Sequence, residues 1–192
     1  MSKNRLEAFS DAVIAIIITI MVLALEPPSG TSLGDLGPLL PKLGSYALSF
    51  LFLGIYWNNH HHLFQTVERV NGTILWANLH LLFWLSLIPF VTGWMGESHF
   101  ASWPVALYGL DLLLDATAYS ILTLALVAEH GRSSTLARAL GSDVKGRGSV
   151  VAYLISLPLA FVSPGLACAL FVAVALWWLV PDRRMERAIA GR

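Results

Sequence analysis

Charged residues are scarce in this sequence. Only 12% of its 192 residues are Asp, Glu, Lys or Arg, and the twelve acidic and twelve basic residues leave no formal net charge. A typical soluble domain carries about 25% charged residues. Hydrophobic residues make up 56% of the chain and the mean hydropathy is +0.68. We therefore expect an integral membrane protein, and the balanced charge argues against a nucleic-acid partner.

Cysteine and the common catalytic motifs are also scarce or absent. The single cysteine, Cys168, excludes an intramolecular disulfide framework. The P-loop, HExxH and GxSxG motifs do not occur, and neither does the TVGYG filter of potassium channels. Ser10 and Asp11 are adjacent, so on a helix they point about 100° apart and cannot act as a nucleophile and its base. We predict no enzymatic activity and no cofactor.

Long uncharged runs predict membrane-spanning helices, which need about 20 mainly apolar residues. The last run, Ser149–Pro181, has 33 residues without a charge. As one helix it would measure about 50 Å, too long for a hydrocarbon core of about 30 Å. The V-S-P-G stretch at Val162–Gly165 instead predicts a turn between two helices. We predict an all-α polytopic membrane protein, one six-helix domain with spans at 6–25, 43–65, 72–95, 102–128, 149–162 and 165–181.

The basic residues predict how the chain is oriented. If six spans begin in the cytoplasm, eleven of the twelve Lys and Arg residues lie inside and only Lys42 lies outside. Five spans would place the four C-terminal arginines outside, against the positive-inside rule. We therefore predict that the N- and C-termini are both cytoplasmic.

The first span has a polar beginning and an apolar remainder. After Asp11, fourteen residues follow without a charge. The i, i+3, i+4, i+7 spacing places Ile16, Thr19, Ile20 and Leu23 on one face, and Asp11 lies about 140° around the helix from Ile16. Periodicity alone fits ordinary packing of this face against lipid or another helix. A carboxylate near the membrane core, however, needs a partner or a purpose.

Three consecutive histidines, His60–His62, lie near the end of the second span. Consecutive side chains on a helix point about 100° apart, so the three histidines cannot face one ion. Zinc sites on helices use histidines at i and i+4, but the residue four positions after His60 is Phe64. Ligands would have to come from other helices, so we predict no metal site. One histidine is expected to face the bundle and bond to Asp11, and Asn78 of the third span can both donate and accept in linking such groups.

Asp111 and Asp115 are four residues apart and share one face of the fourth span. They could form a proton relay, a cation site or part of a water-filled vestibule. Together with His60–His62 they support an alternative function, a proton-coupled secondary transporter, which inverted repeats would favour. A metal-dependent intramembrane enzyme is a third possibility, and bound zinc would support it.

Three stretches give the sequence a resemblance to a known family. Arg5, Phe9, Ser10 and Asp11 match the R-x-x-x-F-S-D signature of the bacterial relatives of transmembrane protein 175, the lysosomal potassium channel family. The stretches Y-W-N-N-H-H-H-L-F and N-L-H-L-L-F-W-L-S-L-I-P-F resemble the family's second and third spans. The similarity is specific over the first three spans and only architectural after Trp103.

The resemblance implies a moderately potassium-selective channel in the bacterial cell membrane, a homotetramer that conducts potassium ions without a carbonyl filter. The first helix of each subunit would line the pore. Ile16, five residues after the motif Asp, would form the constriction, with a ring of Thr19 hydroxyls above it and Ile20 and Leu23 along the wider part. A structural hydrogen-bond network would hold this helix in place; its members would be Arg5, Ser10, Asp11, Asn78 and one histidine, His61 or the preceding His60.

Overall fold

The computed structural model describes residues 2–131, 134, 136–137 and 143–180. These residues are helical apart from their connections and form no strand, which confirms the all-α class. The helices are α1 (Lys3–Leu23), a 3₁₀ helix η1 (Leu33–Leu39), α2 (Leu40–Gln65), α3 (Gly72–Leu85), α4 (Ile88–Glu97), α5 (Ser102–His130), α7 (Val144–Val162) and α8 (Pro164–Leu179).

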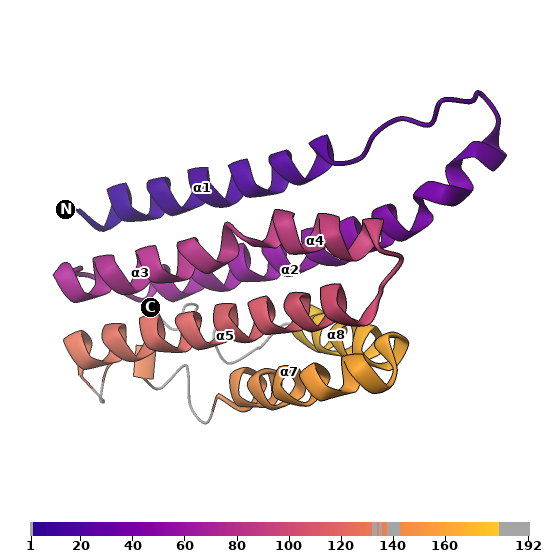
Figure 1. Ribbon diagram of the computed structural model, residues 1–192. Helices are drawn as coiled ribbons and strands as arrows, with labels where there is room; N and C mark the ends of the chain where they lie inside the picture. Colours follow the sequence, from indigo (N-terminus) through magenta and orange to yellow (C-terminus); the bar gives the residue numbers. More distant parts are fainter. Residues whose placement is uncertain (1, 132–133, 135, 138–142, 181–192) are drawn as a thin grey trace.

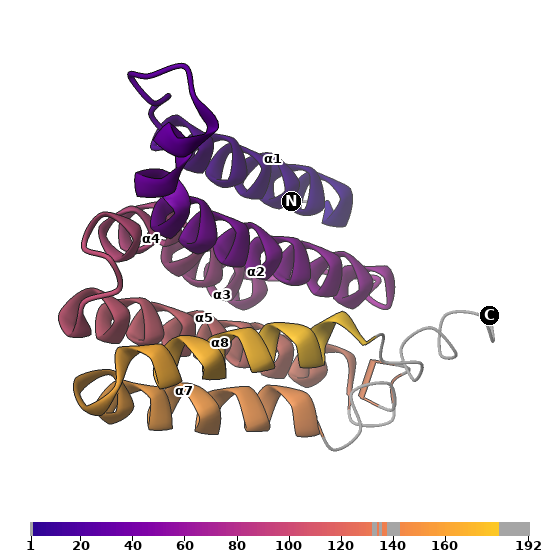
Figure 2. The same ribbon diagram turned by 90° about the vertical axis from the view of Figure 1, so that its right-hand side faces the viewer.

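The helices form an elongated bundle with α1 along one edge (Figures 1 and 2). α1 packs against α2, α3 and α4, whereas α5 lies between this group and the α7–α8 pair. Among the described residues, four segments are long and apolar enough to cross a membrane: Lys3–Leu23, Leu33–Gln65, Gly72–Glu97 and Ser102–His130. Pro164–Leu179 is a shorter apolar helix. The chain is thus a multi-pass membrane protein.

The third predicted span, 72–95, is interrupted. α3 ends at Leu85 and α4 begins at Ile88, so the chain breaks just before the predicted kink at Pro89. Proline has no backbone N–H to offer the carbonyl of Leu85, and its ring clashes with that carbonyl. The chain instead tightens, and the Leu87 N–H donates to the Trp84 carbonyl at 2.9 Å.

The last two helices are separated by Ser163, within the V-S-P-G stretch. α7 begins at Val144, five residues before the predicted 149, because the Asp143 carboxylate caps it by accepting from the Gly146 N–H at 3.1 Å. α8 ends at Leu179, and residue 181 of the predicted span lies outside the described residues.

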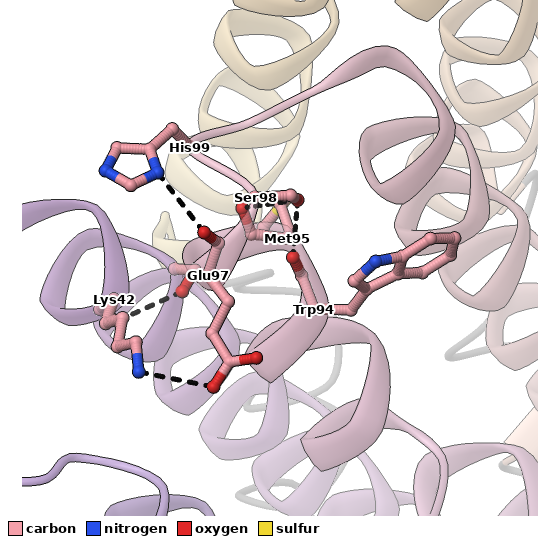
Figure 3. A network of polar contacts seen from close by, with 7 residues as sticks. Lys42, Trp94, Met95, Glu97, Ser98 and His99 are labelled. Carbon is pink, nitrogen blue, oxygen red and sulfur yellow. Dashed lines mark hydrogen bonds and ion pairs between the residues drawn. The ribbon is translucent and has the colours of Figure 1, made fainter.

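Two apolar clusters hold the bundle together. One gathers buried side chains of α1, α2, α3 and the second half of α5. The other gathers the first half of α5 with α7 and α8 and includes Phe52 of α2 and Met95 of α4. At the end of the bundle where α2 begins, Lys42 Nζ pairs with Glu97 Oε1 at 3.2 Å and ties α2 to α4 (Figure 3).

Candidate pore-lining helix and its polar anchor

The α1 helix has two different faces. Ile14, Ile17 and Met21 are at most 5% exposed and pack into the bundle. On the other side Ile16, Ile20 and Leu23 are 55%, 49% and 78% exposed, and Thr19 is exposed among them. This exposed stripe (Ile16, Thr19, Ile20 and Leu23) lies on the side of α1 that is not buried in the subunit. The helix itself lies at the edge of the bundle (Figure 1).

Thr19 is the polar member of the exposed stripe. Its hydroxyl donates back along the helix to the carbonyls of Ile16 at 2.9 Å and Ala15 at 3.0 Å. This back-bonding occupies the hydroxyl hydrogen. The oxygen keeps lone pairs, so it can act as an acceptor or as a cation ligand on the exposed side.

A buried hydrogen-bonded chain holds the opposite side of α1. The His60 Nε2–H of α2 donates to Asn78 Oδ1 of α3 at 2.8 Å, because a carbonyl oxygen can only accept. Asn78 Nδ2 donates to Ser10 Oγ at 2.9 Å, and Ser10 donates to the Leu6 carbonyl at 2.9 Å. Ser10 and Asn78 are 0% exposed and His60 is 1% exposed. The chain joins three helices without a charged group.

Asp11 lies beside this chain and has a different partner. Its Oδ1 accepts from Trp57 Nε1 at 3.0 Å. The expected histidine–Asp11 hydrogen bond does not occur within the described residues. Trp57 was missed from sequence, although it opens the W-N-N-H-H-H-L-F stretch and its indole N–H can only donate, which suits a carboxylate.

The remaining predicted network residues lie outside the buried chain. His61 stacks on Trp57, with ring centroids 6.1 Å apart, and its Nε2 accepts from Gln65 at 2.8 Å. The Arg5 guanidinium is exposed and has no hydrogen bond or ion pair within the described part of the chain. The structure therefore brings together Ser10, Asn78 and His60 but leaves His61 and Arg5 at the surface of the subunit.

Asp111 and Asp115 lie on α5 and are 4% and 0% exposed. No hydrogen bond or ion pair joins them to His60–His62 within the described residues. In the same part of the chain, no group of three or more His, Cys, Asp or Glu side chains is arranged to hold a metal ion.

Comparisons with known proteins match both the sequence and the fold. The model of the family described as "Endosomal/lysosomal potassium channel TMEM175" matches residues 5–89. A potassium channel of Chryseobacterium sp. (strain P1-3) is 53% identical over 189 residues, covering 98% of each chain. The endosomal/lysosomal proton channel TMEM175 of Danio rerio is 29% identical over 140 residues, 69% of this chain and 25% of that one.

A solved structure has a similar arrangement of helices. The crystal structure of a lysosomal potassium-selective channel TMEM175 homolog from Chamaesiphon minutus superposes with a TM-score of 0.81 and 26% sequence identity. The match covers 93% of this chain and 96% of that chain. The likeness extends well beyond the first three spans, where the sequence motifs end.

Proposed function

The chain belongs to the TMEM175 family, and from this premise we propose that it is a cation channel of the bacterial plasma membrane that conducts K⁺ in preference to Na⁺. The observation that carries the proposal is the exposed stripe of α1. It consists of three bulky aliphatic side chains and one hydroxyl, on a helix whose opposite face is fixed by a buried polar chain. The buried chain fixes the rotation of α1, as a pore lined by this helix requires.

In the proposed assembly four subunits place their α1 helices around a common axis. The stripe of each subunit then faces the axis, and Ile16 forms the narrowest ring. A ring of aliphatic side chains blocks ions by steric exclusion and dewetting when it is narrow. It lets a partly dehydrated cation pass when it widens.

Selectivity in such a pore depends on the cost of removing water from the ion. No backbone carbonyls are available to replace the hydration shell, so K⁺, which loses water more easily than Na⁺, passes more readily. The Thr19 oxygens, whose hydrogens are held by the helix backbone, would offer a ring of ligands next to the constriction. We expect moderate selectivity.

The polar anchor would set the angle at which α1 presents its stripe. The Ser10–Asn78–His60 chain ties α1 to α2 and α3, and the Trp57–Asp11 bond adds a second tie to α2. Arg5 continues the exposed side of α1 and has no partner within the described part of its own subunit. A neighbouring subunit is the place where this guanidinium would find an acceptor.

The alternative, a proton-coupled secondary transporter, requires a relay between Asp111, Asp115 and the histidine cluster. His60 is instead bonded to Asn78, and His61 to Gln65. The channel is the better-supported function on this observation.

Single-channel recording of purified protein in a planar bilayer, with K⁺ on one side and Na⁺ on the other, tests the proposal. We expect discrete current steps that reverse in the direction of the K⁺ gradient. Ile16→Ala widens the constriction and should raise Na⁺ permeability relative to K⁺. Ile17→Ala removes the same atoms from the buried face and should leave the permeability ratio unchanged.

Two results would contradict the proposal. An unchanged ratio in Ile16→Ala would remove Ile16 from the pore. Silent bilayers, together with proton-driven uptake by reconstituted liposomes, would establish the transporter.

A further inference from the structure

A second polar feature lies inside each subunit, on α5. Tyr108, Asp111 and Asp115 follow one another at intervals of three and four residues and so share one face of the helix. Tyr108 and Asp115 are 0% exposed and Asp111 is 4% exposed. None of these residues belongs to α1, so the feature is separate from the proposed pore and does not rest on it.

The two carboxyl groups have no neutralising partner. Within the described residues, both oxygens of Asp115 and Oδ2 of Asp111 are buried without a hydrogen-bond partner. The buried side chains of α3 and α4 include no titratable group. The titratable side chains that interact with the pair are Tyr108 of the same helix, Tyr56 of α2 and Tyr153 of α7.

None of those groups carries a positive charge. Two ionised carboxylates one helical turn apart in a membrane-embedded core, without a cation or hydrogen-bond donors, are energetically very unfavourable. A proton is the smallest species that removes this cost, and it needs no further ligands.

A chain of hydroxyls runs from Tyr108, which shares the α5 face of the pair, to Thr92 of α4. The Tyr108 hydroxyl lies 2.9 Å from Ser49 Oγ, and Ser49 Oγ lies 2.6 Å from Thr92 Oγ1. In each contact either oxygen can be the donor, so all the bonds can reverse direction together. Such a chain can pass a proton along its length and then reset by rotation of the hydroxyls.

One cavity lies at the Thr92 end of the hydroxyl chain, and another lies beside α5. Thr92 and Ser45 line a cavity of about 20 Å³. Lys42 and Glu97, which form the ion pair shown in Figure 3, also line it. A second cavity of about 30 Å³ is lined by Tyr56, Tyr153 and Ala116, the residue that follows Asp115. Either volume is sufficient for one water molecule.

We propose that Asp111 and Asp115 form a proton-binding site inside each subunit, loaded from the Lys42–Glu97 end of the bundle through Thr92, Ser49 and Tyr108. A hydronium ion at that end gives one proton to Thr92 and leaves as water, and Thr92, Ser49 and Tyr108 each accept one proton and release one. A carboxylate oxygen of the pair forms the new O–H bond with the proton that leaves Tyr108, once side-chain rotation or a bridging water brings these two oxygens together. No electron transfer or further reactant is involved. By the distribution of basic residues, this end faces the outside of the cell.

Infrared spectroscopy of the full-length purified protein tests the site, because the C=O stretch of a protonated carboxyl group is resolved from that of a carboxylate. At neutral pH we expect a protonated-carboxyl band in the wild type. The band should be lost in Asp115→Asn or Asp111→Asn and in the double variant. It should persist in Asp35→Asn, the same change in the connection between α1 and α2. A wild type without the band, or a double variant that keeps it, overturns the site.

Deuterium exchange tests the route. After transfer to D₂O, the shift of the band reports how fast the buried proton is replaced. Tyr108→Phe removes the α5 hydroxyl of the chain and should slow the exchange about tenfold, which corresponds to a barrier increase of about 1.4 kcal/mol, while the band itself remains. Unchanged exchange overturns the route through Tyr108. Both measurements are independent of conduction, so failure of the pore proposal would not affect them.

Discussion

Asn78 is the residue through which three helices are joined. It belongs to α3, accepts from His60 of α2 and donates to Ser10 of α1, and it is fully buried. An amide suits this position because it carries a donor and an acceptor on one planar group. A hydroxyl could make both contacts only with a different geometry, and an aliphatic side chain could make neither.

Replacing Asn78 with alanine should lower the free energy of unfolding by about 1–3 kcal/mol, because the buried His60 N–H loses its acceptor. Thermal unfolding in detergent measures the change. Thr73→Ala, on the exposed side of the same helix, is the matched control and should have little effect. Equal melting temperatures for the two variants would show that the buried chain contributes no stability.

Trp57 holds Asp11 through its indole N–H. Trp57→Phe removes this donor but keeps an aromatic ring next to His61, and Asp11→Ala removes the acceptor. Both variants should lower the stability of the proposed tetramer or its open probability more than its ion selectivity. Dissociation of the proposed tetramer in increasing detergent and single-channel recording measure these effects, with Trp76→Phe, 75% exposed on α3, as control. Altered selectivity with intact assembly would mean that Asp11 faces the ions.

At these positions the sequence predicted the kind of side chain better than its partner. Asn78 was recognised as a link because a polar amide in an apolar span needs partners. The choice among three consecutive histidines was open, since a helix turns by about 100° per residue and spacing alone does not fix which residue of α2 faces α3. The structure places His60 there and turns His61 toward Gln65. Trp57 was missed because an indole in a membrane span is usually interpreted as packing.

At the scale of the helices, the α2–α4 contact depends on a glycine. A Cβ atom at Gly96 would lie 2.9 Å from the Lys42 Cα and 2.5 Å from Ser45 Oγ. The Lys42 atom belongs to the backbone, so a side chain at position 96 would push the two helices apart. The Lys42–Glu97 ion pair closes the same contact at the end of α4.

Gly96→Ala should therefore destabilise the protein by about 1–3 kcal/mol through overpacking, even though alanine favours a helix more than glycine does. Gly93→Ala is the control, because a Cβ atom there meets nothing within 4 Å. Thermal unfolding should show a lower melting temperature for the first variant and an unchanged or higher one for the second. A stabilised Gly96→Ala variant would mean that the helices can separate at no cost.

The existence of the helices could be predicted from hydropathy, but not all their ends. The break before Pro89 and the break at Ser163 both follow from proline chemistry. The first break lies before the predicted kink at Pro89, because α3 ends at Leu85, whose carbonyl has no N–H donor at position 89. The early start of α7 at Val144 was missed since the prediction stopped at the last charge, whereas hydrogen bonding continues past the apolar run. The break between α3 and α4 leaves two shorter helices within one apolar segment.

At the scale of the whole molecule, the exposed stripe of α1 and the distribution of charge describe one orientation of the subunit. In the proposed assembly the stripe faces the symmetry axis that the subunits share. Eleven of the twelve Lys and Arg residues are predicted to lie on the cytoplasmic side, including Arg5 in the polar beginning of α1. Lys42 is predicted to lie outside. The proposed entrance for protons at Lys42 and Glu97 is then external, and the anchor of α1 at Ser10 is near the cytoplasm.

Cysteine labelling tests this orientation, because Cys168 is the only native thiol. In a Cys168→Ser background, Thr31→Cys lies in the connection between α1 and α2, and Ser2→Cys lies just before α1. A membrane-impermeant maleimide should label Thr31→Cys in intact cells and should label Ser2→Cys only after permeabilisation. The opposite pattern would place eleven basic residues outside. Labelling of both sites in intact cells would mean that the chain inserts in two orientations, which the eleven-to-one distribution of Lys and Arg does not favour.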